Sequence, residues 1–249
     1  MAELIAEGFE AHPGPGRMLA GAVASGKVAH AYLFVGPVGV GKRDAARAFG
    51  RLASCHRPAE RQGVLGPCGA CPSCERPFAP DRHHDLMVVD PAEKESRVAV
   101  EGPGSGKETP LIDRLRHAQE FVAIRPVLAP VKCLILLGMD ALQDVHMNAI
   151  LKTIEEPPAH AMVLLTAANA SSVLPTILSR CQRVDLSPAP PERILATMGR
   201  DDEAARLAAL LSGGRPAVAR RLMDAEDLDT MVRGLADLRQ LAMAGDPLS

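Results

Sequence analysis

A glycine-rich segment ending in a lysine is the first part of this 249-residue chain that could do chemistry. Residues 36–42 read Gly-Pro-Val-Gly-Val-Gly-Lys, the pattern G-x-x-x-x-G-K, in which backbone N–H groups surround phosphates at a helix N-terminus. An apolar run (31–35) precedes the loop and an Ala- and Arg-rich run (42–52) follows it, as a strand and a helix should. A glycine turn with a chance lysine is the weaker interpretation in that context. We therefore predict a nucleotide-binding loop that uses Gly36, Gly39, Gly41 and Lys42.

The same loop lacks the groups that would hold magnesium. A Ser or Thr hydroxyl after the lysine normally ligates the ion, but this chain has Arg43 there. An acidic residue at the end of an apolar strand should supply the second contact, but the matching strand ends without one, in residues 136–139. Asp140 lies three residues after Leu137, so its side chain would be several ångström away from the position that this carboxylate should occupy. We predict that magnesium-dependent hydrolysis is absent or very weak, whereas ATP can still bind because the amides and Lys42 are retained.

Four cysteines form a second candidate site. Twelve residues separate Cys55 from Cys68, and two residues separate each of the next pairs, Cys68 to Cys71 and Cys71 to Cys74. Such spacings let four sulfurs turn toward one tetrahedral Zn²⁺. With four protein ligands the site would be closed and therefore structural. Unrelated thiols and a redox pair are the alternatives, both less suited to this spacing.

The remaining thiols and the nearby imidazoles are not needed for that site. Because four cysteines complete the coordination of zinc, we expect His56, His83 and His84 to be surface histidines. Cys133 and Cys181 should be isolated thiols in the core.

An alternation of strands and helices must position these residues. Strands alternating with helices imply an α/β fold with a doubly wound parallel sheet flanked by helices. The continuous apolar run 132–137 is typical of a central strand covered on both faces. The expected strands are 31–35, 85–89, 132–137, 161–166 and 183–186, and the expected helices are 16–27, 42–52, 111–122 and 145–155.

Three segments interrupt or follow this core. Residues 55–84, rich in Cys, Pro, Gly and His and without periodicity, should form a loop-rich insertion held by the metal. The charged segment 91–110 should be a flexible surface loop. A Pro-rich boundary near 187 precedes short helices separated by glycines. We thus expect a P-loop core over 1–187, a small helical lid domain over 188–226, and a further helix within 227–249.

Composition excludes several classes of function. The net charge of −2 and pI near 6.4 provide no overall basic field for nucleic acid, so any DNA contact must be local or indirect. Aromatic residues make up 2% of the chain, too few for a platform that stacks bases. The N-terminus, with two Glu among seven residues, resembles no secretory signal, and no run of about 18 apolar residues occurs. We expect a cytoplasmic protein without membrane contact.

Four segments together resemble the AAA+ subunits of the bacterial DNA polymerase III clamp loader. They are His30–Lys42, the cysteine cluster, Asn148-Ala-Ile-Leu-Lys-Thr-Ile-Glu-Glu-Pro-Pro158, and Leu174-Pro-Thr-Ile-Leu-Ser-Arg-Cys181, and they span most of residues 15–225. The last two, in that order after a zinc insertion, are highly specific. The resemblance implies an AAA+ P-loop core with a helical lid.

The clamp-loader family contains motor subunits with an intact P-loop and an Asp-Glu pair, and delta-prime subunits in which these are often degraded. This chain resembles the second kind. The resemblance implies that Arg180, in Ser179-Arg180-Cys181, is an arginine finger acting in trans on ATP held by a neighbouring motor subunit. A capping or salt-bridging arginine is the alternative. Thr166 and Asn169 fall near the family's sensor position, and no role is assigned to them.

The implied partners are the motor subunits and the clamp-opening subunit of a hetero-oligomeric ring, with the sliding clamp and primed DNA reached through the complex. The family's helical collar domain is represented only from Asp227 onward, which indicates either a fragment or assembly through the first two domains. Two other functions stay open. One is a catalytically active gamma/tau-like ATPase motor. The other is a zinc-ribbon-like nucleic-acid module using Arg57, Arg61, Arg76 and Arg82.

Overall fold

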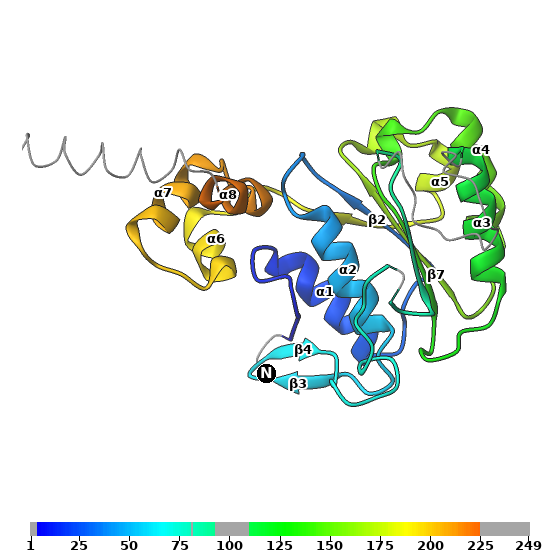
Figure 1. Ribbon diagram of the computed structural model, residues 1–249, viewed down its shortest axis with the longest axis horizontal. Helices are drawn as coiled ribbons and strands as arrows, with labels where there is room; N and C mark the ends of the chain where they lie inside the picture. The colour runs from blue at the N-terminus through cyan, green and yellow to red at the C-terminus, as the bar shows by residue number, and fades with distance from the viewer. Residues whose placement is uncertain (1–3, 81, 93–109, 225–249) are drawn as a thin grey trace, which may run out of the picture. The chain divides into compact units, whose positions relative to one another are not determined.

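The computed structural model describes residues 4–80, 82–92 and 110–224, which belong to two compact units (Figure 1). The first unit contains the chain up to Pro37 and Lys42–Leu186. The second contains Val38–Gly41 and the chain from Ser187 onward. The predicted helix after Asp227 and most of the predicted 91–110 loop lie outside the described residues.

A five-stranded parallel sheet forms the centre of the first unit. Its spatial order is β5-β6-β7-β2-β8, and every neighbouring pair is parallel. All residues of β6, β7 and β2 are buried, because these strands are continuous apolar runs covered on both faces. The predicted parallel sheet is confirmed. The strands are β2 (Ala31–Val35), β5 (Leu86–Val89), β6 (Lys132–Leu136), β7 (Ala161–Ala167) and β8 (Gln182–Asp185).

Helices cover both faces of the sheet, with α1 and α2 on one side and α3, α4 and α5 on the other (Figure 1). Side chains that alternate along β2 divide between the two layers. Leu33 belongs to the core shared with α3 and α4, whereas Tyr32 packs edge-on against Phe49 of α2 at 4.8 Å between ring centroids. The helices are α1 (Pro13–Ala24), α2 (Lys42–Ala53), α3 (Leu111–Ala123), α4 (Asp144–Glu155) and α5 (Pro175–Leu178).

The insertion after α2 contains a small sheet that the sequence analysis did not predict. Strands β3 (Ala59–Arg61) and β4 (Val64–Gly66) form an antiparallel hairpin, and β1 (Ile5–Ala6) pairs in parallel with β4. The turn residues Gln62 and Gly63 both have positive φ, 53° and 78°, as a tight hairpin turn requires. Strands of three residues are too short for an alternating pattern to be read from the sequence.

The described part of the second unit after Ser187 contains three helices, in agreement with the short helices predicted after residue 190. They are α6 (Pro191–Met198), α7 (Glu203–Leu211) and α8 (Pro216–Met223). Gly199 ends α6 in the left-handed conformation, and Asp202 caps α7 by accepting the amide of Ala205. A core of small side chains, among them Ala205, Ala208 and Ala219, lets the helices approach closely.

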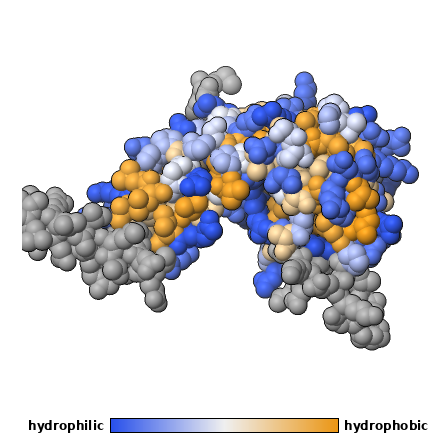
Figure 2. Space-filling model, turned by 90° about the horizontal axis from the view of Figure 1, so that it is seen from above, coloured by the Kyte–Doolittle hydropathy of each residue, from blue (hydrophilic) through white to orange (hydrophobic). Residues whose placement is uncertain are grey.

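The described surface mixes polar residues with exposed apolar ones, as the face in Figure 2 shows. Large hydrophobic side chains at least half exposed are Val38, Ile124, Val127, Val145, Leu210 and Leu211. Single exposed apolar residues are normal on a protein surface and carry no functional meaning by themselves.

Candidate functional site

The glycine loop joins the inner strand β2 to the start of α2, as predicted. Gly39 and Gly41 have φ values of 85° and 102°, in the region that residues with a side chain rarely adopt. The loop begins next to the sheet, because the amide of Gly36 donates to the carbonyl oxygen of Ala167 at 3.2 Å. The local geometry therefore explains why glycines stand at these positions and fits a loop that takes phosphates.

The lysine of the loop, Lys42, contacts backbone oxygens of the same loop. Its Nζ donates to the carbonyl oxygens of Gly36 at 2.6 Å and Pro37 at 2.9 Å. Burial lowers the pKa of Lys42, and the negative charge of Asp140 opposes this effect. Phosphate oxygens bound by the loop would compete with the two carbonyls for this ammonium group.

Arg43, which stands where a magnesium-ligating hydroxyl would be, is bound to an acidic side chain. Its guanidinium forms an ion pair with Oδ2 of Asp90, the residue that follows β5. The other oxygen of Asp90, Oδ1, accepts the amide of Ala92 at 3.0 Å. Both oxygens of this carboxylate therefore have partners within the chain.

The end of β6 likewise provides no magnesium ligand. Leu137 is buried, and Gly138 takes the left-handed conformation with φ of 61°. The amide of Gly138 donates to Oγ1 of buried Thr166 at 2.9 Å. Asp140 lies three residues after Leu137, and its Oδ1 accepts the amide of Ala168. The residues at these positions thus fit a nucleotide phosphate but do not fit the magnesium ion that normally accompanies it.

The four predicted cysteine ligands come together. All four sulfurs lie within 4.8 Å of one another, and the Cys55–Cys71 and Cys68–Cys74 sulfurs are each 4.0 Å apart. Four sulfurs at about 2.3 Å from a central zinc ion would be about 3.8 Å apart. The donor set and its spacing fit zinc.

The acidities of these thiols are coupled to one another. Burial raises the pKa of Cys71, but amide hydrogen bonds outweigh this effect and lower it to about 6. Burial, together with the neighbouring sulfurs, raises the pKa of Cys74 to about 12. A backbone hydrogen bond from Ala70 lowers the pKa of Cys68 as well, whereas burial raises the pKa of Cys55. A bound dication would favour the thiolate form of all four.

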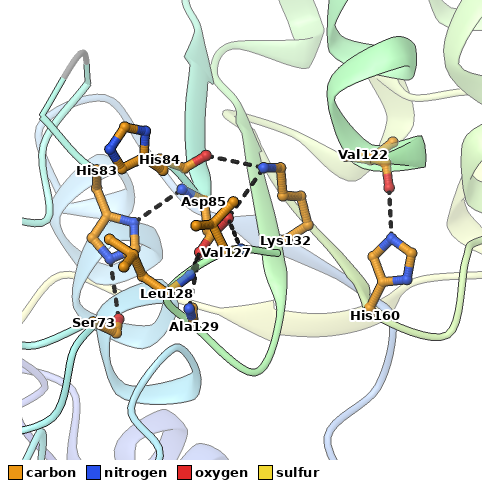
Figure 3. A network of polar contacts seen from close by, with 10 residues as sticks. All are labelled: Ser73, His83, His84, Asp85, Val122, Val127, Leu128, Ala129, Lys132 and His160. Carbon is orange, nitrogen blue, oxygen red and sulfur yellow. Dashed lines mark hydrogen bonds and ion pairs between the residues drawn. The ribbon is translucent and has the colours of Figure 1, made fainter. Parts of the chain in front are cut away.

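The prediction that His83 is a surface histidine is wrong. The residue is 3% exposed, and its Nε2 lies 3.0 Å from Oγ of Ser73 (Figure 3). Its Nδ1 accepts the amide of Asp85 at 3.2 Å. The neutral ring must therefore carry its proton on Nε2 and donate it to Ser73. His56 and His84 are exposed, as expected, and His56 bonds the carbonyl oxygen of Leu128.

A buried carboxylate beside His83 was missed from the sequence. Asp85 accepts the amides of Val127, Leu128 and Ala129 at 2.8, 2.6 and 2.9 Å, and Nζ of Lys132 at 3.1 Å (Figure 3). Burial alone would raise the pKa of Asp85, but these hydrogen bonds outweigh it, so the pKa lies below its usual value. Charged residues at the start of two buried strands, β5 and β6, were the available signal.

Arg180 follows the short helix α5 and is half exposed. Its Nη1 donates to the carbonyl oxygen of Thr176 at 3.0 Å and to Oγ of Ser179 at 3.1 Å. Its Nη2 pairs with Oε1 of Glu155, the last residue of α4, at 3.2 Å. An exposed ion pair of this kind contributes about 0–1 kcal/mol, so a stronger anion could displace Glu155 at little cost.

The arginines around the cysteines do not gather into one cluster that all four share. Arg57 and Arg61 are exposed, and Arg61 donates to the carbonyl oxygen of Cys68 at 3.3 Å. Arg76 and Arg82 line a hollow with His83, His84 and the apolar side chains of Pro77, Leu86 and Phe121. Such charges are typical of a solvated surface.

The sequence comparisons with known proteins all point to subunits of DNA polymerase III. The family described as DNA polymerase III, delta subunit, matches residues 12–190. A relative from Pseudomonas aeruginosa, DNA polymerase III subunit delta', is 34% identical over 229 residues, covering 89% of this chain and 65% of the relative. DNA polymerase III subunit tau of Bacillus subtilis is 29% identical over 192 residues, which cover 77% of this chain and 30% of the tau subunit.

Solved structures support the fold. A DNA polymerase III gamma subunit-related protein from Thermotoga maritima matches with a TM-score of 0.54 and 20% identity, over 87% of this chain and 62% of that one. A mutant of RuvB from Thermotoga maritima matches with a TM-score of 0.50 and 16% identity, over 86% of this chain and 60% of that one. These likenesses are to AAA+ proteins and show the predicted fold class.

The chain spans less than two thirds of the length of the relatives above. Among the described helices, none has both the length and the apolar character needed to cross a membrane.

Proposed function

Because the chain belongs to the family described as DNA polymerase III, delta subunit, we propose that it acts as a delta-prime-type subunit of the clamp loader. In this role it aids ATP-driven loading of the sliding clamp during DNA replication in the cytoplasm. It performs no phosphate chemistry of its own and supplies Arg180 to the ATP site of a neighbouring motor subunit. Its partners are the motor and clamp-opening subunits of a hetero-oligomeric ring, and it reaches the clamp and primed DNA through the complex.

The ion pair between Arg43 and Asp90 is the observation that carries this proposal. An active P-loop ATPase needs a hydroxyl after the lysine and a carboxylate at the end of the neighbouring strand. Here the first position holds an arginine whose charge is engaged, and the second, at Leu137–Gly138, holds no carboxylate. A subunit built in this way supports assembly and contributes to catalysis elsewhere.

The surroundings of Arg180 support its assignment as an arginine finger. The side chain is 41% exposed, and its hydrogen bonds to Thr176 and Ser179 hold the guanidinium at the end of α5. Glu155 balances the charge of Arg180 through an ion pair that is weak in water. The phosphate of a neighbouring subunit's ATP would be a stronger partner, because it carries more negative charge and accepts paired hydrogen bonds.

The domain organisation is part of the proposal. We assign the P-loop core to residues 1–187, the lid to 188–226 and the start of a collar to 227–249. The change of compact unit after Leu186 supports the first boundary. The zinc module, about 55–84, serves as a structural clip: its four cysteines fix a segment whose own strands have three residues each.

The test is the ATPase of the reconstituted clamp loader containing Arg180→Ala. Removing an arginine finger costs about 10³-fold or more in turnover at the site it serves. The variant should therefore assemble normally and lose the share of turnover contributed by that one site. Arg183→Ala is a matched control, because Arg183 is an exposed arginine three residues on that pairs with Asp185. Unchanged ATPase in the Arg180→Ala complex would refute the arginine finger.

A second candidate function is an active ATPase motor of the same complex. The 29% identity to a tau subunit favours it. Magnesium-dependent ATP hydrolysis by the isolated chain, lost in Lys42→Ala, would establish this function and overturn the first. We expect no such hydrolysis, because neither Arg43 nor the residues ending β6 can ligate magnesium.

A further inference from the structure

The residues of the phosphate loop do not fit magnesium, because the position after Lys42 holds an arginine that pairs with an acidic side chain. Arg43 is the second residue of α2 and directly follows Lys42. Helix α2 lies against β7 and β6, so its first turn faces the carboxyl ends of these strands. From there the guanidinium reaches Asp90, at the end of the edge strand β5.

Asp90 is held rigidly. Its side chain is 8% exposed, its Oδ1 accepts the amide of Ala92, and its carbonyl oxygen accepts Nη2 of Arg114 at 2.8 Å. A carboxylate this buried needs a cationic partner, because burying an unpaired charge is costly. Arg43 provides that partner, so Asp90 has neither a free oxygen nor an unbalanced charge to offer a divalent ion.

Each of the two cations at the start of α2 has an anionic neighbour: Asp140 is near Lys42, and Asp90 pairs with Arg43. In a magnesium-dependent site the carboxylate charge is left for the ion to neutralise. Here a guanidinium does so permanently, and it is 47% exposed. It has five N–H donors, of which the pair with Asp90 engages Nη2.

We propose that Arg43 replaces magnesium in this loop, and that the loop binds the phosphates of a nucleoside di- or triphosphate without a divalent cation. The planar guanidinium bridges Asp90 and a phosphate oxygen, as magnesium bridges carboxylate and phosphate elsewhere. The bound nucleotide is not hydrolysed, because the site lacks the magnesium ion that bridges the β- and γ-phosphates and neutralises the charge of the transition state.

The experiment is a calorimetric titration of the full chain with ADP, once in excess EDTA and once in excess magnesium chloride. The two dissociation constants should agree within about threefold. Binding that is about tenfold tighter with magnesium, or binding absent in EDTA, would overturn the proposal. Lys42→Ala should abolish binding in both buffers. Persistence of binding in that variant would place the nucleotide elsewhere and equally overturn the proposal.

Arg43→Thr restores the hydroxyl and removes the tethered cation. Its binding in EDTA should weaken by about tenfold or more, with part of the affinity regained on adding magnesium. Because this change leaves Asp90 unpaired, Arg43→Lys is the second variant: it keeps the charge and should keep the fold and metal-independent binding. Arg51→Thr, near the other end of the same helix, is the control and should match the unmodified protein. An Arg43→Thr protein that is folded and binds as well in EDTA would contradict the proposal.

This inference is independent of the arginine finger. Arg180 is tested by turnover at a neighbouring subunit's site, and Arg43 by equilibrium binding to the isolated chain. Either result can fail while the other stands.

Discussion

The charged residues on which the proposed functions and the stability of this chain depend form three ion pairs. Arg43 with Asp90, Arg180 with Glu155, and Lys132 with Asp85 differ mainly in exposure. The Arg180 pair is 40% exposed or more on both sides and is therefore weak and exchangeable. The Lys132 pair is at most 5% exposed, so each partner depends on the other.

The buried pair leads to a prediction for Asp85→Asn. The substitution leaves Lys132 charged and buried without its counter-ion and weakens the hydrogen bonds from Val127, Leu128 and Ala129. We expect the free energy of unfolding to fall by about 3–5 kcal/mol, as measured by urea titration at neutral pH.

Two comparisons sharpen this experiment. Asp185→Asn removes an exposed carboxylate that pairs with Arg183, and it should change stability by less than about 1 kcal/mol. The double variant Asp85→Asn with Lys132→Met should recover part of the loss, because no buried charge is then left unpaired. A loss under about 1 kcal/mol in Asp85→Asn alone would show that this network does not hold the loop before β6.

At the scale of elements, the cysteine insertion is the part that cannot hold its shape by apolar burial. Its hairpin β3–β4 has two strands of three residues, and an isolated two-stranded hairpin is marginally stable at best. Pairing with β1 adds two residues. The four sulfurs belong to the same insertion, where a metal would replace the missing core.

Metal analysis of the purified protein should therefore give one zinc ion per chain. Cys71→Ser should lower the zinc content below about half an equivalent and make residues 55–84 the first site of limited proteolysis. The control is Cys181→Ala, which changes a partly buried thiol packed against the core of the sheet and should retain zinc. Less than about half an equivalent in the unmodified protein would count against the four-cysteine site.

At the scale of the whole molecule, the parallel topology collects the functional residues. The loop after β2, Asp90 after β5, Gly138 after β6 and Ala168 after β7 all follow the carboxyl ends of strands in one sheet. Ligands of open α/β sheets bind at this edge, because parallel strands deliver their loops there. The same sheet carries Asp85 just before β5, at the opposite end, where it can affect stability without touching the phosphate loop.

The global stability should depend on acid through Asp85. Because its pKa is lowered in the folded chain, its contribution is fully present above the unfolded value of about 3.9 and is lost as pH falls through the folded value. Thermal melting should therefore show stability falling below about pH 4. The Asp85→Asn variant should fall less steeply over the same range, since it has no carboxylate to protonate there. Parallel curves for the two proteins would contradict this assignment.

Local patterns in the sequence determined the strands, helices and loop. Continuous apolar runs identified β2, β6 and β7, the glycine spacing identified the phosphate loop, and the cysteine spacing brought four sulfurs together as expected. These features depend on residues close in the chain, so periodicity and spacing contain the needed information. The absence of a Ser or Thr after Lys42 could likewise be read directly.

Only the tertiary structure showed which side chain Arg43 contacts. Arg43 and Asp90 are 47 residues apart, and Asp85 meets the amide of Val127, 42 residues away. Such pairs depend on strand order and on which helix covers which strand, neither of which a local pattern specifies. The β3–β4 hairpin was not foreseen because its strands of three residues are too short to show an alternating pattern, and His83 proved to be buried in contact with Ser73 and Asp85. The sequence alone showed that Arg43 stands where a magnesium-ligating hydroxyl would be, and the fold showed that this arginine is bound to the buried carboxylate of Asp90.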